Sequence, residues 1–252
     1  MQLMEKQFVV FRDLGRMDYK TAWKYQDVLM KENLEVKASD GNRQSEIGNA
    51  ELKDLPTKHY LLFVEHSPVY TMGKSGKMEH VLINEEERLE KGIEFYQTNR
   101  GGDITFHGLG QIVGYPILDL EKFYTDIGRY LRELEEVIIL TLAEYDIRAG
   151  RSAGETGVWI DADVKGRERK ICAMGVRCSR WITMHGFAFN INTDLGYFNY
   201  IIPCGIQHKK VTSLKEELGR EVPVAEVKEK LKRNFEKVFG VELFPLSPKG
   251  ET

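Results

Sequence analysis

The chain of 252 residues is 42% hydrophobic and 30% charged, which is the composition of an ordinary globular protein that folds in water. Its formal net charge of −3 excludes a protein that works mainly by coating nucleic acid, because such proteins carry a basic excess. The longest apolar run, residues 137–140 with Leu142 and Ala143, is too short to cross a bilayer, and the amino terminus lacks the layout of a signal peptide. We therefore expect a cytoplasmic protein, or one of an equivalent organelle compartment, with no membrane and no nucleic acid among its partners.

The first half of the chain alternates strand and helix patterns. In order, it predicts a strand over residues 8–11, a helix over 19–34, a polar surface loop over 38–50, a pair of strands over 60–65 and 69–71, and a buried strand over 112–118. The helix places Ala22, Tyr25 and Leu29 on one face, and Ser67-Pro68 separates the two paired strands.

The second half opens with the strongest helix pattern of the sequence. Apolar residues recur at steps of three and four between Ile127 and Leu142, and Thr125 is a suitable N-cap, so we expect a helix over residues 125–145. The elements expected after it are an antiparallel meander of strands over 157–160, 170–177 and 184–191, a hydroxyl-capped helix over 212–218, and an amphipathic helix opened by Pro223. The pattern predicts a mixed α/β fold in one catalytic domain over residues 1–252, with 212–252 as its helical carboxyl-terminal extension.

The three cysteines, Cys172, Cys178 and Cys204, are an odd number and make a poor disulfide framework. They form no CxxC pair, and no histidine pair stands near them at a zinc-like spacing, so we expect free thiols and no bound metal. Cys204 differs from the other two, because Pro203 before it fixes one backbone angle and Gly205 after it is conformationally free. Such a turn exposes a thiol as a nucleophile requires, although a buried packing role is the commoner use of a free cysteine. Cys172 and Cys178 lie in strand patterns, where packing is the default.

Several other polar residues admit both a chemical and a structural interpretation. Lys170 begins a strand pattern, where a lysine is usually solvated, but an ammonium next to a cysteine lowers the pKa of the thiol from about 8.5 towards neutrality. The Arg100-Gly101-Gly102 run is a weak phosphate-loop signal and is more typical of a tight turn. His107 and His185 each precede a glycine, which favours hydrogen-bonded scaffold histidines at strand ends or bends over catalytic bases.

A basic stretch lies between the strand patterns over residues 157–160 and 170–177. Residues 166–170 read Gly-Arg-Glu-Arg-Lys, and the pattern is typical of a solvated hairpin. With Arg177, Arg180, Lys209 and Lys210, this stretch forms a basic patch that could steer an acidic carrier protein to the site.

Six segments of the chain resemble, in order and spacing, the lipoyl(octanoyl) transferase family. They are residues 65–71, 100–111, 157–159, 170–177, 185–190 and 203–205. The resemblance covers about residues 60–215, and six motifs in order are far more specific than any one of them. It implies the α/β fold of biotin and lipoate protein ligases, in which helices flank a mixed, mostly antiparallel central sheet.

The resemblance also implies a reaction and its residues. Cys204 would take an octanoyl group from octanoyl-acyl carrier protein as a thioester, and a lysine of a lipoyl domain would then remove the group as an amide. The acceptors would be the lipoyl domains of 2-oxoacid dehydrogenases and the glycine cleavage H protein, and no cofactor is implied. Lys170 would lower the pKa of Cys204, and the resemblance leaves open whether it also relays protons or acts only as a fixed charge. The residues implied to line the acyl tunnel are Arg100, Gly101, Gly102, Asp103, Ile104, Thr105, Phe106, His107, Ala173, Met174, Gly175, Gly186, Phe187 and Ala188.

Two positions depart from the family pattern, and other functions remain open. Leu109 stands where the family usually has proline, and Asp103 stands where glutamine is common, so the mouth of the tunnel can differ. An ATP-dependent lipoate–protein ligase on the same fold would need no cysteine and would have no reason to keep Lys170 and Cys204 together. An amidotransferase that moves octanoyl between lipoyl proteins would carry its cysteine elsewhere. A non-catalytic module that binds lipoyl domains would tolerate loss of the cysteine, and a cysteine hydrolase fits poorly because no Asn or Asp is placed to orient a histidine.

Overall fold

A sheet of nine strands runs through the centre of the computed structural model, which describes residues 6–41, 56–203 and 210–245. Its strands are β1 (Phe8–Arg16), β2 (His59–Glu65), β6 (Gln111–Ile117), β7 (Ala149–Gly150), β8 (Val158–Ile160), β9 (Arg169–Ser179), β10 (Ile182–Asn190), β11 (Lys210–Val211) and β12 (Glu242–Pro245). The order across the sheet is β12-β1-β2-β6-β10-β9-β8-β7, with β11 beside β9. β1 runs parallel to β2 and β12, and β11 runs parallel to β9, whereas the other neighbours are antiparallel.

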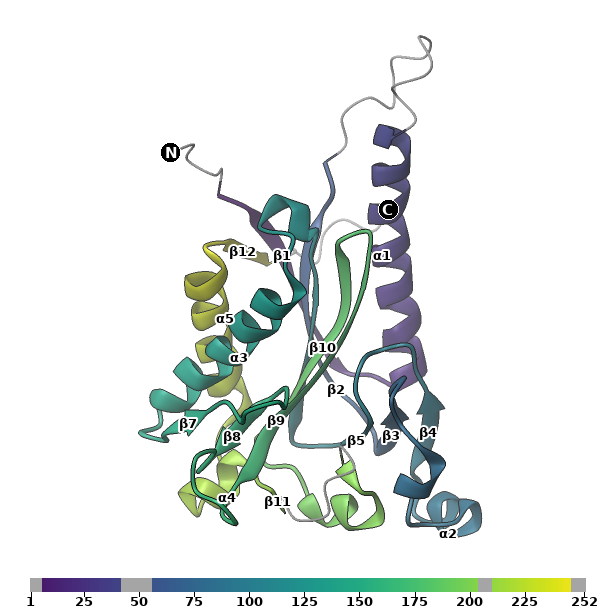
Figure 1. The fold of residues 1–252 in the computed structure, drawn as a ribbon, viewed down its shortest axis with the longest axis vertical. Coiled ribbons are helices and arrows are strands. Elements are labelled where there is room, and N and C mark those ends of the chain that lie inside the picture. Colours follow the sequence, from purple (N-terminus) through teal and green to yellow (C-terminus); the bar gives the residue numbers. More distant parts are fainter. Residues whose placement is uncertain (1–5, 42–55, 204–209, 246–252) are drawn as a thin grey trace.

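Helices cover both faces of this sheet (Figure 1). α1 (Tyr19–Gly41) packs on one face, over a cluster that contains Leu62 and Met184. α3 (Ile127–Ala143) and α5 (Val224–Phe239) pack on the opposite face and bury the apolar sides of both helices. α4 (Leu214–Leu218) precedes α5. Within the described residues, no helix is both long and apolar enough to span a membrane.

A smaller sheet lies beside the large one, below α1 in Figure 1. Its order is β4-β3-β5, formed by β3 (Val69–Met72), β4 (Glu94–Gln97) and β5 (Ile104–His107), and α2 (Glu85–Glu90) precedes β4. Tyr70, Phe106 and Phe198 belong to its apolar cluster, the last of them from the 3-10 helix η4 (Leu195–Tyr200). The fold therefore has two sheets with separate cores.

Much of the expected order of elements is confirmed. β8, β9 and β10 form the predicted antiparallel meander, and β6 is the predicted buried strand. α4 has the expected hydroxyl cap, because the side chain of Ser213 accepts a hydrogen bond from the Glu216 amide. α5 begins after Pro223, as predicted.

Other expectations were wrong in detail. The strands over residues 60–65 and 69–71 do not pair with each other, because β2 pairs with β1 and β6 whereas β3 pairs with β4 and β5. α1 continues through Gly41, so the predicted loop over residues 38–50 begins as helix, and residues 42–50 lie outside the described part of the chain.

Two element ends were also placed incorrectly. Thr125 does not cap α3, because the side chain of Asp126 accepts the hydrogen bond from the Arg129 amide instead. The stretch over residues 212–252 is not wholly helical, since β12 returns to the large sheet and pairs with β1.

His59 shows how the fold treats a buried titratable group. His59 is the first residue of β2 and is 4% exposed. Its Nδ1 accepts a hydrogen bond of 3.2 Å from the Asp119 amide. Its Nε2 lies 3.2 Å from the Gln7 side-chain oxygen. Burial lowers the pKa of His59 from 6.5 to about 4, so the imidazole is neutral in the folded protein.

We predict that His59 makes stability depend on pH. The unfolded chain binds this proton near pH 6.5 and the folded chain only near pH 4, so stability is lost as the pH falls through that window. His59→Gln should therefore lose on the order of 2 kcal/mol less than the wild type between about pH 7.5 and pH 5. Urea unfolding at both pH values measures this difference. Equal losses in the two proteins would contradict the depressed pKa.

Candidate active site

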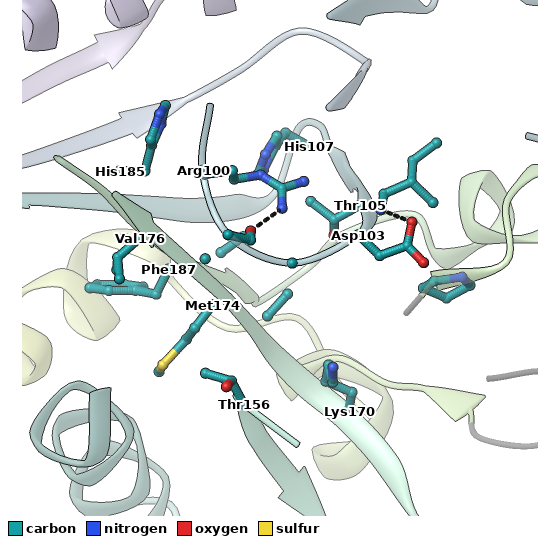
Figure 2. Close-up of a pocket in the computed structure, with 18 of the residues that line it drawn as sticks. Arg100, Asp103, Thr105, His107, Thr156, Lys170, Met174, Val176, His185 and Phe187 are labelled. Carbon is teal, nitrogen blue, oxygen red and sulfur yellow. Dashed lines mark hydrogen bonds between the residues drawn. The ribbon is translucent and has the colours of Figure 1, made fainter. Parts of the chain in front are cut away.

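A pocket of about 760 Å³ lies between the large sheet and the loop that precedes β5. Residues of β6, β9 and β10 line it from one side, and residues 100–103 line it from the other. The volume is within the range of roughly 300–1,000 Å³ typical of small-molecule sites. Figure 2 shows that Lys170 and Asp103 lie on one side of this pocket, whereas Met174, Phe187 and Val176 lie on the other.

Lys170 and most residues that the resemblance places in the acyl tunnel meet in this pocket. Those that line it are Arg100, Gly101, Gly102, Asp103, Ile104, Thr105, His107, Lys170, Ala173, Met174, Gly175, Gly186, Phe187 and Ala188. Phe106 does not line it, and its ring instead stacks on Tyr197 with centroids 4.6 Å apart. Cys204 lies outside the described residues, and Pro203, which directly precedes it, lines the pocket.

Lys170 is buried rather than solvated, with 8% of its surface exposed. A bulge between β8 and β9 determines its direction: Val158 pairs with Cys172, but the next residue, Trp159, pairs with Lys170. Directly opposed residues of antiparallel strands lie on the same face, and the Lys170 ammonium sits 4.6 Å from the centre of the Trp159 ring. The aromatic face compensates part of the hydration that the ammonium has lost.

A buried carboxylate supports the strand that carries Trp159. Glu135 of α3 is fully buried, and its Oε1 accepts a hydrogen bond of 2.9 Å from the Gly157 amide. Arg132 and Arg151 contact its other oxygen at 2.8 and 3.0 Å. Burial raises the pKa of Glu135, against the lowering effects of the amide and the two guanidinium groups. Gly157 lies next to Lys170, since a Cβ there would contact the lysine stem at 3.6 Å and the Cys172 carbonyl at only 2.5 Å.

The Arg100 side chain forms hydrogen bonds that stabilise the loop over residues 100–103. Its guanidinium donates hydrogen bonds to the carbonyl and the hydroxyl of Thr71 and to the carbonyl of Gly101. The Gly101 amide donates a hydrogen bond of 2.9 Å to the Val176 carbonyl, which fastens the loop to β9. These guanidinium donors therefore bind oxygens of the protein itself, which does not favour the phosphate-loop interpretation.

Glycines allow this loop to approach its neighbours. A Cβ on Gly175 would lie 2.7 Å from the Gly101 carbonyl oxygen, and a Cβ on Gly73 would lie 2.3 Å from the Gly102 carbonyl oxygen. Both distances are shorter than any ordinary contact, so larger residues would push the loop away from the sheet. The glycines therefore fix the width of the pocket.

The buried histidines of the pocket are neutral parts of the scaffold. His107 ends β5 and contacts Gln111 and Thr71 through its two ring nitrogens, at 2.9 and 3.1 Å. Burial lowers its pKa well below 6.5. His185 bends β10 with a φ of 61°, and its Nε2 lies 2.8 Å from the Asn99 side-chain oxygen. Burial, with the nearby Arg100 and Arg177 charges, lowers the pKa of His185 to about 3.

The side of the pocket opposite Lys170 is apolar. Met174, Val176 and Phe187 supply part of it, and Ile127 and Leu131 of α3 contribute from above the sheet. A hydrocarbon chain can therefore lie against side chains of its own polarity while its polar end lies near Lys170.

Several residues that line the pocket are not predicted from the sequence. Ile127 and Leu131 carry the periodic pattern of α3, which signals a core face and does not distinguish a core from a pocket wall. His80 and Thr156 also line the pocket, and neither belongs to a motif whose spacing predicts it. Leu109, a departure from the family pattern, does not line the pocket and is 47% exposed.

The remaining sequence candidates have structural roles. Cys172 is fully buried, and burial raises the pKa of this thiol and of Cys178. The basic patch is weaker than its sequence suggests, because Arg169 forms ion pairs with Glu217 and Asp161 at 2.6 and 2.5 Å. Lys209 lies outside the described residues.

The structure resembles solved ligases over nearly its whole length. A bi-partite lipoate protein ligase from Thermoplasma acidophilum aligns with a TM-score of 0.65 at 17% identity, over 96% of this chain and 87% of that chain. A lipoate-protein ligase A bound with ATP gives a TM-score of 0.64 at 15% identity, over 95% and 88%. At such low identity the likeness establishes the fold alone, and it confirms the fold expected from the sequence.

Other proteins share much more of their sequence with this chain than these ligases do. An octanoyltransferase of Christiangramia forsetii is 56% identical over 236 residues, which are 93% of this chain and 97% of the relative. An octanoyltransferase of Flavobacterium johnsoniae is 57% identical over 236 residues, with 93% and 98% covered. Residues 18–236 match the lipoyl protein ligase A/B catalytic domain. The chain belongs to this family, among its octanoyltransferases, and is therefore an acyltransferase.

Proposed function

We propose that the chain transfers an octanoyl group from octanoyl-acyl carrier protein to a specific lysine of lipoyl domains, through a thioester on Cys204. The observation that carries the proposal is the buried ammonium of Lys170, which faces a pocket whose opposite side is apolar. Pro203 lines the same pocket, and Cys204 is the next residue in the sequence. A cysteine nucleophile with a neighbouring cation is the arrangement that covalent acyl transfer requires.

The first half-reaction loads the enzyme. The Cys204 thiolate attacks the carbonyl carbon of the octanoyl thioester, and the tetrahedral intermediate expels the thiolate of the carrier protein. Lys170 gives that thiolate a proton, so the half-reaction leaves octanoyl-Cys204, a carrier thiol and a neutral lysine. Because one thioester replaces another, the step needs no ATP.

The second half-reaction delivers the group to an amine. The lysine of a lipoyl domain attacks octanoyl-Cys204, an amide forms, and the Cys204 thiolate leaves. An amide is more stable than a thioester, so this step runs downhill.

The family to which the chain belongs suggests the partners. The donor is octanoyl-acyl carrier protein, and the acceptors are the lipoyl domains of 2-oxoacid dehydrogenases and the glycine cleavage H protein. The study of the Thermoplasma ligase names an E2 lipoyl domain with it, which supports an acceptor of this kind. The reaction belongs in a reducing cytoplasm, where a catalytic thiol stays reduced, and residues 1–252 act as one catalytic domain.

We predict that octanoyl-Cys204 accumulates when the protein meets octanoyl-acyl carrier protein without ATP. Intact mass spectrometry should show a hydroxylamine-sensitive octanoyl adduct on the wild type and on Cys172→Ala, and none on Cys204→Ala. Cys172→Ala is the matched control, because that thiol is buried and its pKa is raised. An absent adduct, with lipoyl domains modified only when ATP and free acid are supplied, would instead identify a ligase.

We predict that Lys170→Ala slows enzyme acylation most at neutral pH. Without the ammonium, a thiol of ordinary pKa near 8.5 is only a few per cent ionised at pH 7, so the rate should fall about 30-fold and recover as the pH rises. Lys74→Ala is the control, because Lys74 is exposed and does not line the pocket. Stopped acylation assays read by mass over a pH series measure the effect. A loss of the same size at every pH would rule out this role for the charge.

A further inference from the structure

The pocket contains a histidine–carboxylate pair that the proposed reaction has not yet used. His80 ends the 3-10 helix η2 (Met78–His80), and its Nδ1 lies 2.6 Å from Oδ2 of Asp103. The side chains are 15% and 10% exposed, and both residues line the pocket.

The backbone fixes both members of the pair. Oδ1 of Asp103 accepts a hydrogen bond of 2.6 Å from the Ile104 amide, which leaves Oδ2 for the imidazole. The carbonyl of His80 accepts a hydrogen bond of 2.8 Å from the Ile202 amide, and Val81 forms a bridge with Ile201. His80 is therefore attached to the segment that leads into Pro203, at the polar side of the pocket.

His80 differs from the scaffold histidines in its surroundings. Both ring nitrogens of His107 contact neutral polar groups. Nδ1 of His80 instead lies 2.6 Å from a carboxylate oxygen, in a close ionic contact that lacks the angle of a hydrogen bond. The other charged groups that line the pocket are Arg100, Glu155 and Lys170. Outside the pocket, Lys77 and Glu79 on the same segment pair with each other at 3.3 Å, and Lys91 lies 5.1 Å from the ring centre of the adjacent Tyr200. Asp103 is thus the charged group in direct contact with the imidazole.

The second half-reaction needs a base of this kind. A lysine side chain is an ammonium at neutral pH, since its ordinary pKa is about 10.4, and it cannot attack a carbonyl until it loses a proton. Two protons leave the nitrogen before the amide is complete. Neutral Lys170, produced in the first half-reaction, can accept only one of them.

We propose that His80 accepts the first proton from the acceptor lysine, with Asp103 compensating the charge of the imidazolium. This inference rests on the proposed function. Octanoyl-Cys204, the acceptor ammonium, neutral His80 and neutral Lys170 yield the amide, the Cys204 thiolate, protonated His80 and protonated Lys170. The N–C bond forms, the C–S bond breaks, and one positive charge is present on balance before and after. A carboxylate behind an imidazole stabilises the ion in the same way in other base-assisted transfers.

The test separates the two half-reactions on one enzyme sample. Octanoyl-enzyme is first prepared from octanoyl-acyl carrier protein and verified by mass, and it is then mixed with a lipoyl domain or with hydroxylamine. Hydroxylamine is uncharged at neutral pH and needs no base to lose a first proton. We expect His80→Gln to slow transfer to the lipoyl domain about 100-fold at neutral pH, while its rate with hydroxylamine changes less than about threefold.

Two further variants complete the design. Asp103→Asn should slow transfer to the lipoyl domain on the order of 10-fold, again with little effect on hydroxylamine. His59→Gln is the matched control, because it replaces a histidine outside the pocket and should leave the ratio of the two rates unchanged. With His80→Gln the rate should keep rising with pH, because a growing fraction of the acceptor lysine loses its proton to the solvent without a base.

Each outcome decides one claim. Equal losses with both amines would make His80 a structural residue and overturn the inference, as would unchanged transfer to the lipoyl domain. Failure of both pocket variants to form octanoyl-enzyme would overturn it too, because His80 would then be needed before the amine arrives. Failure of the wild type to form octanoyl-enzyme would refute the proposed function itself.

Discussion

An ammonium group that leaves water loses several kcal/mol of hydration, and Lys170 keeps only 8% of its surface exposed. The surrounding structure offsets this loss locally. The Trp159 ring lies 4.6 Å from the ammonium, and a cation over an aromatic face gains roughly 0.5–2 kcal/mol. The bulge that brings Trp159 opposite Lys170 follows Gly157, whose amide is bound by the buried Glu135. A carboxylate in a helix on one face of the sheet thus helps to fix the position of a cation at the edge of the pocket.

The polar and apolar halves of the pocket have different structural origins. The apolar half shares its side chains with the main core, because Met174, Val176 and Phe187 also pack with the residues under α3. The polar half depends on backbone contacts of residues 100–103, which the glycines Gly73 and Gly175 permit. A substitution in the apolar half therefore changes both the pocket and the main core. A substitution in the polar half changes how closely residues 100–103 approach the large sheet.

The sequence predicts the parts of this protein that depend on local pattern. The periodicity of α3 and the polar turns of the β8-β9-β10 meander are local, and both were recognised. Pairing of the strands over residues 60–65 and 69–71 could not be recognised, because their partners, β1, β6, β4 and β5, are distant in sequence. The resemblance located the pocket segments, but it did not show that Phe106 packs in the core of the small sheet, away from the pocket. His80 was missed because its partner Asp103 comes 23 residues later along the chain and only the fold brings them within 2.6 Å.

The two sides of the pocket belong to two separately hydrogen-bonded sheets. The floor is part of the nine-stranded ladder, whereas β5 and the loop before it belong to the three-stranded one with its own apolar cluster. Contacts such as Gly101 to Val176 and His185 to Asn99 join them. Partial opening along this seam would break a few such contacts and leave both ladders intact. Amide hydrogen exchange should then reveal the seam as a boundary between two units of different protection, with the Gly101 amide exchanging before those of β9 and β10.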